Sequence, residues 1–138
     1  MKFWRFTSVV ILLCVIISGC NSIPAQTSVS LGRQFILPLG KTVSVPEENL
    51  LIKFVSVEAD SRCPKDVVCI QAGEARCAMQ VTHDGLTSDL TFVDKGGING
   101  SSTASKDEFI FSFTLLPYPE STQPAASRKY QLTMTITK

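Results

Sequence analysis

The ten residues from Asp60 to Cys69, DSRCPKDVVC, form the chain's densest group of side chains capable of chemistry. Two thiols at this spacing can form a redox couple, bind a metal ion or close a disulfide. A thioredoxin-like redox pair has two intervening residues and lies at a helix amino terminus, whereas five residues separate Cys63 from Cys69. Structural zinc needs four ligands, and the chain's single histidine, His83, is expected to be a solvated turn residue. We therefore favour a disulfide, and predict no metal and no cofactor.

A disulfide between Cys63 and Cys69 requires the chain to turn back on itself. An extended segment of this length would hold the two α-carbons about 20 Å apart, whereas a bridge needs roughly 4.4 to 6.8 Å. Pro64-Lys65-Asp66 suits a type I turn, with proline at its second position. Cys77 lies on the apolar face of an expected strand, which favours a buried free thiol; its pairing with Cys63 or Cys69 is the alternative.

The sequence offers little support for catalysis. An activated nucleophile needs a base within reach, and His83 is the only histidine. No serine-hydrolase elbow, zinc-protease pattern or phosphate-binding glycine loop is present. We expect the acidic pairs Glu47-Glu48 and Asp107-Glu108 to be solvated. The prediction is that the protein is not an enzyme.

The amino terminus has the pattern of an export signal. Lys2 and Arg5 precede an apolar run from Phe6 to Ile17. This run is shorter than the roughly 20 residues that a membrane-spanning helix needs, and its basic start and small-residue end are typical of a secretory signal. We expect residues 1–19 to be removed and the rest to enter an oxidising compartment, where a disulfide persists.

The end of the signal is more specific. Ile17-Ser18-Gly19-Cys20 resembles the lipobox of bacterial lipoproteins. The resemblance implies cleavage after Gly19, followed by attachment of diacylglyceryl and acyl groups such as palmitate to Cys20. Several acyl chains anchor a protein firmly, and Asn21, rather than aspartate, favours the outer membrane, facing the periplasm. The alternative is an ordinary secretory signal with Cys20 as a plain thiol.

The remaining chain suits one domain. Removing 19 of the 138 residues leaves 119, and removing Lys2 and Arg5 leaves 11 basic against 12 acidic residues. This charge balance does not predict a nucleic-acid partner. Residues 20–33 are rich in Ser, Thr, Gln, Ala and Pro, so we expect a lipidated cysteine with a flexible tether. An edge strand through Ile23 to Val29 is the alternative, and the domain is expected to span 34–138.

Short alternating segments with turn signals between them predict an all-β domain. Asp84-Gly85 is a strong hairpin signal because both central residues of such a turn need positive φ. The expected loops are 94–107 and 117–128. We predict a single antiparallel β-sandwich or small barrel of about seven strands; the expected strands are 35–39, 41–45, 50–58, 74–83, 86–93, 109–116 and 130–136.

The segment around the two cysteines also resembles a recurrent pattern. Asp60-Ser61-Arg62-Cys63-Pro64, Cys69, Ala72-Gly73 and Ala75 are similar to the D-S-R-C-P-x4-C-x-x-A-G-x-A pattern of small secreted or lipid-anchored bacterial proteins of unassigned function. The resemblance covers about residues 52–82, and relatives carry a tryptophan where this chain has Gln71. It implies a β domain with a disulfide-closed loop, and no reaction.

These observations predict a lipid-anchored envelope protein with a structural or accessory role. Its partners would be the membrane, through the amino-terminal lipid, and an envelope protein. The alternative is a loop-mediated binding or inhibitor module resembling inhibitors of proteases or lysozymes, because recognition usually lies on loops of a rigid scaffold. Arg62 in this interpretation pairs with a carboxylate or is solvated. The candidate binding residues are Arg62, Lys65, Asp66, Asn99, Tyr118 and Glu120.

Overall fold

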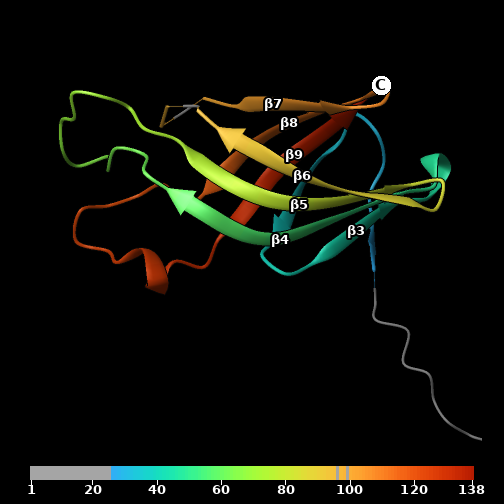
Figure 1. Cartoon of the computed structure of the whole chain (residues 1–138), viewed down its shortest axis with the longest axis horizontal. Helices are drawn as coiled ribbons and strands as arrows, with labels where there is room; N and C mark the ends of the chain where they lie inside the picture. The colour runs from blue at the N-terminus through green and yellow to red at the C-terminus, as the bar shows by residue number, and fades with distance from the viewer. Residues whose placement is uncertain (1–25, 96, 99) are drawn as a thin grey trace, which may run out of the picture.

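The protein is a mainly antiparallel β-sandwich, seen here in a computed structural model that describes residues 26–95, 97, 98 and 100–138 (Figure 1). One sheet has the order β1-β3-β4-β5-β6 and the other β2-β9-β8-β7. The signal, Cys20 and Asn99 lie outside the described residues. The strands are β1 (Thr27–Ser28), β2 (Gln34–Pro38), β3 (Thr42–Val45), β4 (Leu50–Asp60), β5 (Ala75–His83), β6 (Leu86–Asp94), β7 (Ser102–Lys106), β8 (Phe109–Leu116) and β9 (Gln131–Thr137).

The core lies between the two sheets, because each long strand alternates apolar and polar residues and successive side chains point to opposite faces. In β8 the inward side chains include Phe111 and Phe113, which are at most 1% exposed. From the facing sheet, Phe92 lies 5.3 Å and 5.0 Å from their ring centroids. β5 and β9 add the buried side chains Ala75, Cys77, Met79, Val81, Leu132, Met134 and Ile136.

Nine strands are present in the described residues, rather than about seven. β7 lies within the segment 94–107 that was expected to be a loop, and pairs antiparallel with β8. Its sequence, Ser-Thr-Ala-Ser-Lys, gives no hydrophobic signal, since only Ala104 packs against the core. The segment 102–106 is a strand because it pairs with β8, a strongly apolar neighbour.

The chain also joins the sandwich earlier than expected. The short strand β1 pairs in parallel with β3, and Val29 and Leu31 pack against the core. The described part of the expected tether, residues 26–33, therefore belongs to the β domain. The domain boundary at residue 34 was wrong because two separated apolar side chains in a polar segment are a weak sequence signal.

The predicted hairpin is confirmed, with φ of 48° at Asp84 and 80° at Gly85 between β5 and β6. His83 is not the solvated residue we expected, since its side chain is only 24% exposed. Its ring stands edge-on to Phe109 at 5.1 Å. Its Nε2 and Nδ1 lie 3.6 Å from carboxylate oxygens of Asp84 and Asp107.

Three connections gather at one end of the sandwich. The β4–β5, β6–β7 and β8–β9 loops lie at the left in Figure 1, whereas the Asp84-Gly85 hairpin and the carboxyl terminus lie at the right. The functional candidates among the described residues fall on the first group of loops.

Cys77 is free and fully buried, as predicted. Burial raises the pKa of its thiol to about 12, and the negative charge of Asp94 acts in the same direction. Because thiolate is the reactive form, we expect Cys77 in the native protein to resist a thiol reagent and to react fully in denaturant. Peptide mapping after labelling tests this; rapid native labelling at Cys77 would contradict it.

Candidate functional site

The loop end of the sandwich is organised around a buried arginine. Arg62 is 3% exposed and lies two residues after the end of β4. Its Nε and Nη2 donate to the two carboxylate oxygens of Asp60 at 2.8 and 2.9 Å, the bidentate arrangement for which guanidinium is suited. Its carbon Cζ lies 5.0 Å from the ring centroid of Tyr118. The expectation that Arg62 belongs to a binding surface was therefore wrong.

Arg62 also connects the two sheets. Its Nη1 donates to the main-chain oxygen of Leu115 on β8 at 2.7 Å, and to Asp94 on β6 at 3.3 Å. Asp94 in turn accepts a bond from the main-chain N–H of Leu115 at 3.0 Å. The Pro117 carbonyl accepts a further bond from Arg62 Nη2 at 3.3 Å. One side chain thus fixes the ends of strands from both sheets.

Asp60 is the second centre of this cluster. Besides Arg62, it accepts hydrogen bonds from the Tyr130 hydroxyl at 3.0 Å and from Arg128 Nη1 at 3.2 Å. Burial by itself would raise the pKa of Asp60, but the hydrogen bonds and charge of Arg62, with the Tyr130 hydroxyl, bring that pKa below its ordinary value. With Asp94, the cluster balances two carboxylates against two guanidinium groups. This balance is what makes burial tolerable.

Replacing Asp60 by asparagine leaves buried positive charge without its partner. We expect Asp60→Asn to lower the free energy of unfolding at neutral pH by about 3 kcal/mol or more. Because the pKa of Asp60 is lowered on folding, its stabilisation is fully present above the ordinary carboxyl pKa of about 4 and is lost as pH falls through the folded value.

The difference between wild type and Asp60→Asn should therefore shrink in acid. Urea unfolding at a series of pH values measures it. The control is Asp89→Asn, whose carboxylate is exposed and accepts a bond from Gln80 at 3.1 Å. A difference that is small at neutral pH, or that does not change with acidification, would contradict the assigned role.

The base of the β4–β5 loop is closed by short-range contacts. The Ser61 hydroxyl donates to the main-chain oxygen of Glu74 at 2.9 Å, and the Cys63 N–H donates to the Ala72 oxygen at 2.7 Å. Gly73 has φ of 69°, and a β-carbon there would lie 1.9 Å from the main-chain carbonyl oxygen of Ser61. Only glycine fits, both because of its backbone conformation and because of this close approach.

A matched pair of glycines separates these two effects. Gly40 has φ of 78° but open space around an added β-carbon. We expect Gly40→Ala to cost about 1 to 2 kcal/mol from the left-handed backbone, and Gly73→Ala to cost clearly more because the β4–β5 loop must also open. Thermal or urea unfolding of both variants tests this. Equal losses would show that the contact with Ser61 is unimportant.

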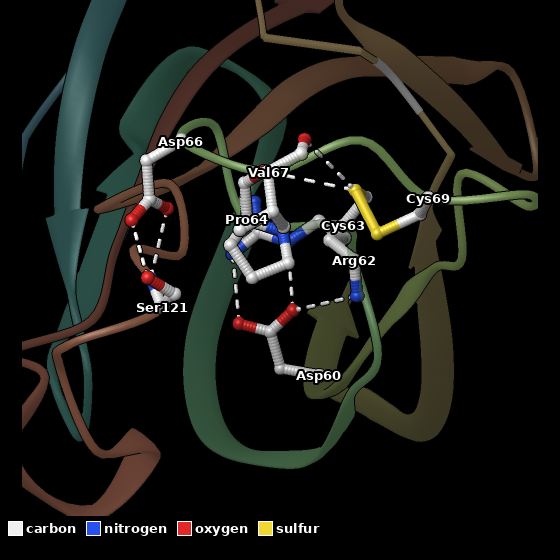
Figure 2. Close-up of a disulfide and its surroundings, with 8 residues drawn as sticks. All are labelled: Asp60, Arg62, Cys63, Pro64, Asp66, Val67, Cys69 and Ser121. Carbon is white, nitrogen blue, oxygen red and sulfur yellow. Dashed lines mark hydrogen bonds and ion pairs between the residues drawn. A yellow bond between two sulfur atoms is a disulfide. The ribbon is translucent and has the colours of Figure 1, made fainter.

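The tip of this loop, which we define as residues 64–71, is closed by a disulfide and contacts the β8–β9 loop. Cys63 and Cys69 form the predicted disulfide, with α-carbons 5.9 Å apart (Figure 2). Lys65 donates its N–H to the Pro119 oxygen at 3.0 Å and forms an ion pair with Glu120. The Asp66 carboxylate accepts bonds from the Ser121 N–H, at 2.9 Å, and from its hydroxyl.

The turn within the tip is displaced by one residue from the prediction. The Val67 N–H donates to the Pro64 oxygen at 3.3 Å, so Lys65 and Asp66 are the central residues. Proline therefore occupies the first position of the turn rather than the second. Figure 2 shows Asp66 facing Ser121 on one side of the tip and the disulfide on the other.

Three aliphatic side chains project from the far part of the tip. Val67 is 45% exposed, and Val68 and Ile70, at 101% and 105%, are as exposed as isolated residues. Ile98, on the neighbouring β6–β7 loop, is 55% exposed. Beside the tip runs an open groove whose lining includes Lys65, Ile98, Pro117, Tyr118, Glu120 and Gln131.

Four of the six predicted binding residues come together here. Lys65 and Glu120 form an ion pair. Asp66 accepts a hydrogen bond from the N–H of Ser121, and Tyr118 lies against Arg62. Arg62 itself is internal, and Asn99 lies outside the described residues. Val68 and Ile70 were not among the residues predicted from the sequence. The available signal was an apolar Val-Val-Cys-Ile run inside a loop, where no strand face could bury it.

In the part of the chain that the structure describes, no group of three or more His, Cys, Asp or Glu side chains is arranged to hold a metal ion. His83 lies at the hairpin end of β5, away from the stapled loop in Figure 1. The loop end exposes apolar side chains on a loop that a disulfide and a buried ion pair restrain.

Comparison with protein-family models gives no match for this chain, and searches of curated proteins and of solved structures give none either.

Proposed function

We propose that the protein is a lipid-anchored, non-catalytic accessory protein of the bacterial cell envelope, whose loop end binds another envelope protein. The observation that carries the binding role is the exposed tip: Val68 and Ile70 project fully into solvent from a disulfide-closed loop. Apolar side chains held rigidly in water favour a partner that buries them, since burial of one such side chain contributes about 1.5 to 3 kcal/mol.

The anchor in this proposal is Cys20. Its support is the signal pattern of residues 1–19 and the Ile17-Ser18-Gly19-Cys20 sequence, and it agrees with the disulfide, which persists in oxidising compartments. Within the described part of the chain, no helix is long and apolar enough to cross a membrane. Asn21 favours the outer membrane, where the domain would face the periplasm.

The rigidity of the loop end supports binding over a passive role. The buried Asp60–Arg62 pair, the Gly73 contact and the Cys63–Cys69 disulfide all restrain the same loop. A partner would therefore meet a surface already in place, and little conformational entropy would be lost on association.

The anchor is tested by metabolic labelling with a fatty-acid analogue. We expect the wild-type chain to be labelled and to fractionate with membranes, and Cys20→Ala to lose both properties. Cys77→Ala, which removes a different cysteine outside the disulfide, should be labelled like the wild type. Persistent labelling of Cys20→Ala would contradict the anchor.

The binding surface is tested by photo-crosslinking in living cells. A photoreactive amino acid at Val68 should give a discrete crosslinked product with an envelope protein. The same group at Leu86, which is 77% exposed at the hairpin end, should not. Identical products from both positions, or none from Val68, would contradict a binding role for the loop end.

A further inference from the structure

The outer part of the tip, residues 67–71, combines two fully exposed side chains with a stretch of main chain, 68–71, that is not paired with other main-chain groups of the described chain. Val68 and Ile70, the two residues on either side of Cys69, are fully exposed. Among the described residues, the main-chain groups of 68–71 form no hydrogen bond with other main-chain groups, unlike Cys63 and Val67, whose N–H groups are paired. Donors, acceptors and side chains are all available to a partner.

This combination matches what a peptide-binding cleft recognises. Such clefts hydrogen-bond to the main chain of an incoming segment and admit side chains from alternate residues into separate pockets. Val68 and Ile70 are alternate residues, and both are β-branched aliphatics of moderate size. A flat apolar surface would use the side chains but leave the main-chain groups buried without partners, at a cost of about 1 to 3 kcal/mol each.

The charges at the tip also restrict the class of partner that it can bind. Lys65 is paired with Glu120, and Asp66 is bonded to Ser121, so the tip carries no unbalanced cation. A membrane surface rich in anionic lipid attracts clusters of basic residues, and a cleft with an acidic pocket selects a free lysine or arginine. Neither is matched by this loop end.

The restraint of the loop suits a segment that occupies a cleft without further folding. The disulfide joins Cys69, between the two exposed aliphatics, to the base at Cys63, which is itself bonded to Ala72. The tip also extends from the left end of the sandwich in Figure 1, away from the place where the described chain begins at Gln26. The tip is therefore accessible to a partner that approaches the loop end of the sandwich.

From this geometry we infer that residues 67–71 occupy the substrate cleft of an endopeptidase selective for small aliphatic side chains, with Val68 and Ile70 as the anchoring side chains, and block it. The inference rests on the proposed binding function and specifies the class of partner. Protease–inhibitor interfaces are largely preformed on both sides, as this loop is.

The test uses the full chain as the cell produces it, in mild detergent, with pancreatic elastase as the aliphatic-selective probe and a chromogenic peptide as substrate. We expect competitive inhibition of elastase and none of trypsin. Val68→Asp or Ile70→Asp should weaken inhibition of elastase about 30-fold or more, as for an anchoring side chain. Leu86→Asp is the matched control, since it adds the same charge at an exposed aliphatic position of the opposite end.

A second variant tests the restraint without altering the exposed side chains. Replacing both Cys63 and Cys69 by serine should weaken inhibition, while circular dichroism reports whether the sandwich stays folded. Because Val68 and Ile70 pack against nothing in the described chain, their aspartate variants should keep wild-type unfolding curves. A loss of inhibition in a folded variant then reports on the cleft contact.

Three outcomes would overturn the inference. They are no inhibition of elastase, inhibition by the Val68→Asp and Ile70→Asp variants as strong as that by the wild-type chain, and inhibition of hen lysozyme instead of elastase. Tip-dependent sedimentation with vesicles of phosphatidylcholine and phosphatidylglycerol, without inhibition, would assign the tip to a lipid surface and also overturn it. If elastase is unaffected while Val68 still crosslinks to an envelope protein in cells, the proposed binding function stands and only the class of partner is wrong.

Discussion

A guanidinium group enclosed between two β-sheets is stable only if nearly every one of its donors has a partner, and the rest of the loop end depends on how Arg62 meets this requirement. Its five N–H groups face Asp60, Asp94, the main-chain carbonyl of Leu115 on β8 of the opposite sheet, and the carbonyl of Pro117 just beyond that strand. Each partner is thereby fixed in turn: β4 through Asp60, β6 through Asp94, and the end of β8 through Leu115. The geometry of the loops follows from a charge that cannot be left unpaired.

The residues that resemble the D-S-R-C-P-x4-C-x-x-A-G-x-A pattern therefore have architectural explanations. Asp60 and Arg62 form the buried pair, Ser61 bonds to Glu74, Cys63 and Cys69 form the disulfide, and Gly73 permits close contact. Ala75 is fully buried at the start of β5. The pattern specifies how the loop is supported, whereas the side chains available to a partner, Val68 and Ile70, lie at positions that it leaves open.

Much of the scaffold could be predicted from sequence, because alternation at period 2 and the Asp84-Gly85 turn are local signals. The disulfide could also be predicted, because it depends on the spacing of Cys63 and Cys69. The burial of Cys77 could be predicted because it depends on which face of its strand the residue occupies. β1 and β7 were missed because their conformation depends on neighbouring strands rather than on their own residues. The burial of Arg62 was missed because Asp94 and Leu115 are distant in sequence, and only the folded topology brings them to the same guanidinium.

The outer tip contributes almost nothing to the interior, and this separation has a consequence for how such a protein changes over time. Val68 and Ile70 can be exchanged for other side chains without creating a cavity or exposing an unpaired charge. Specificity can thus diverge by substitution at a few surface positions while the scaffold stays intact. The same property makes the disulfide-closed loop a natural place to graft a foreign peptide.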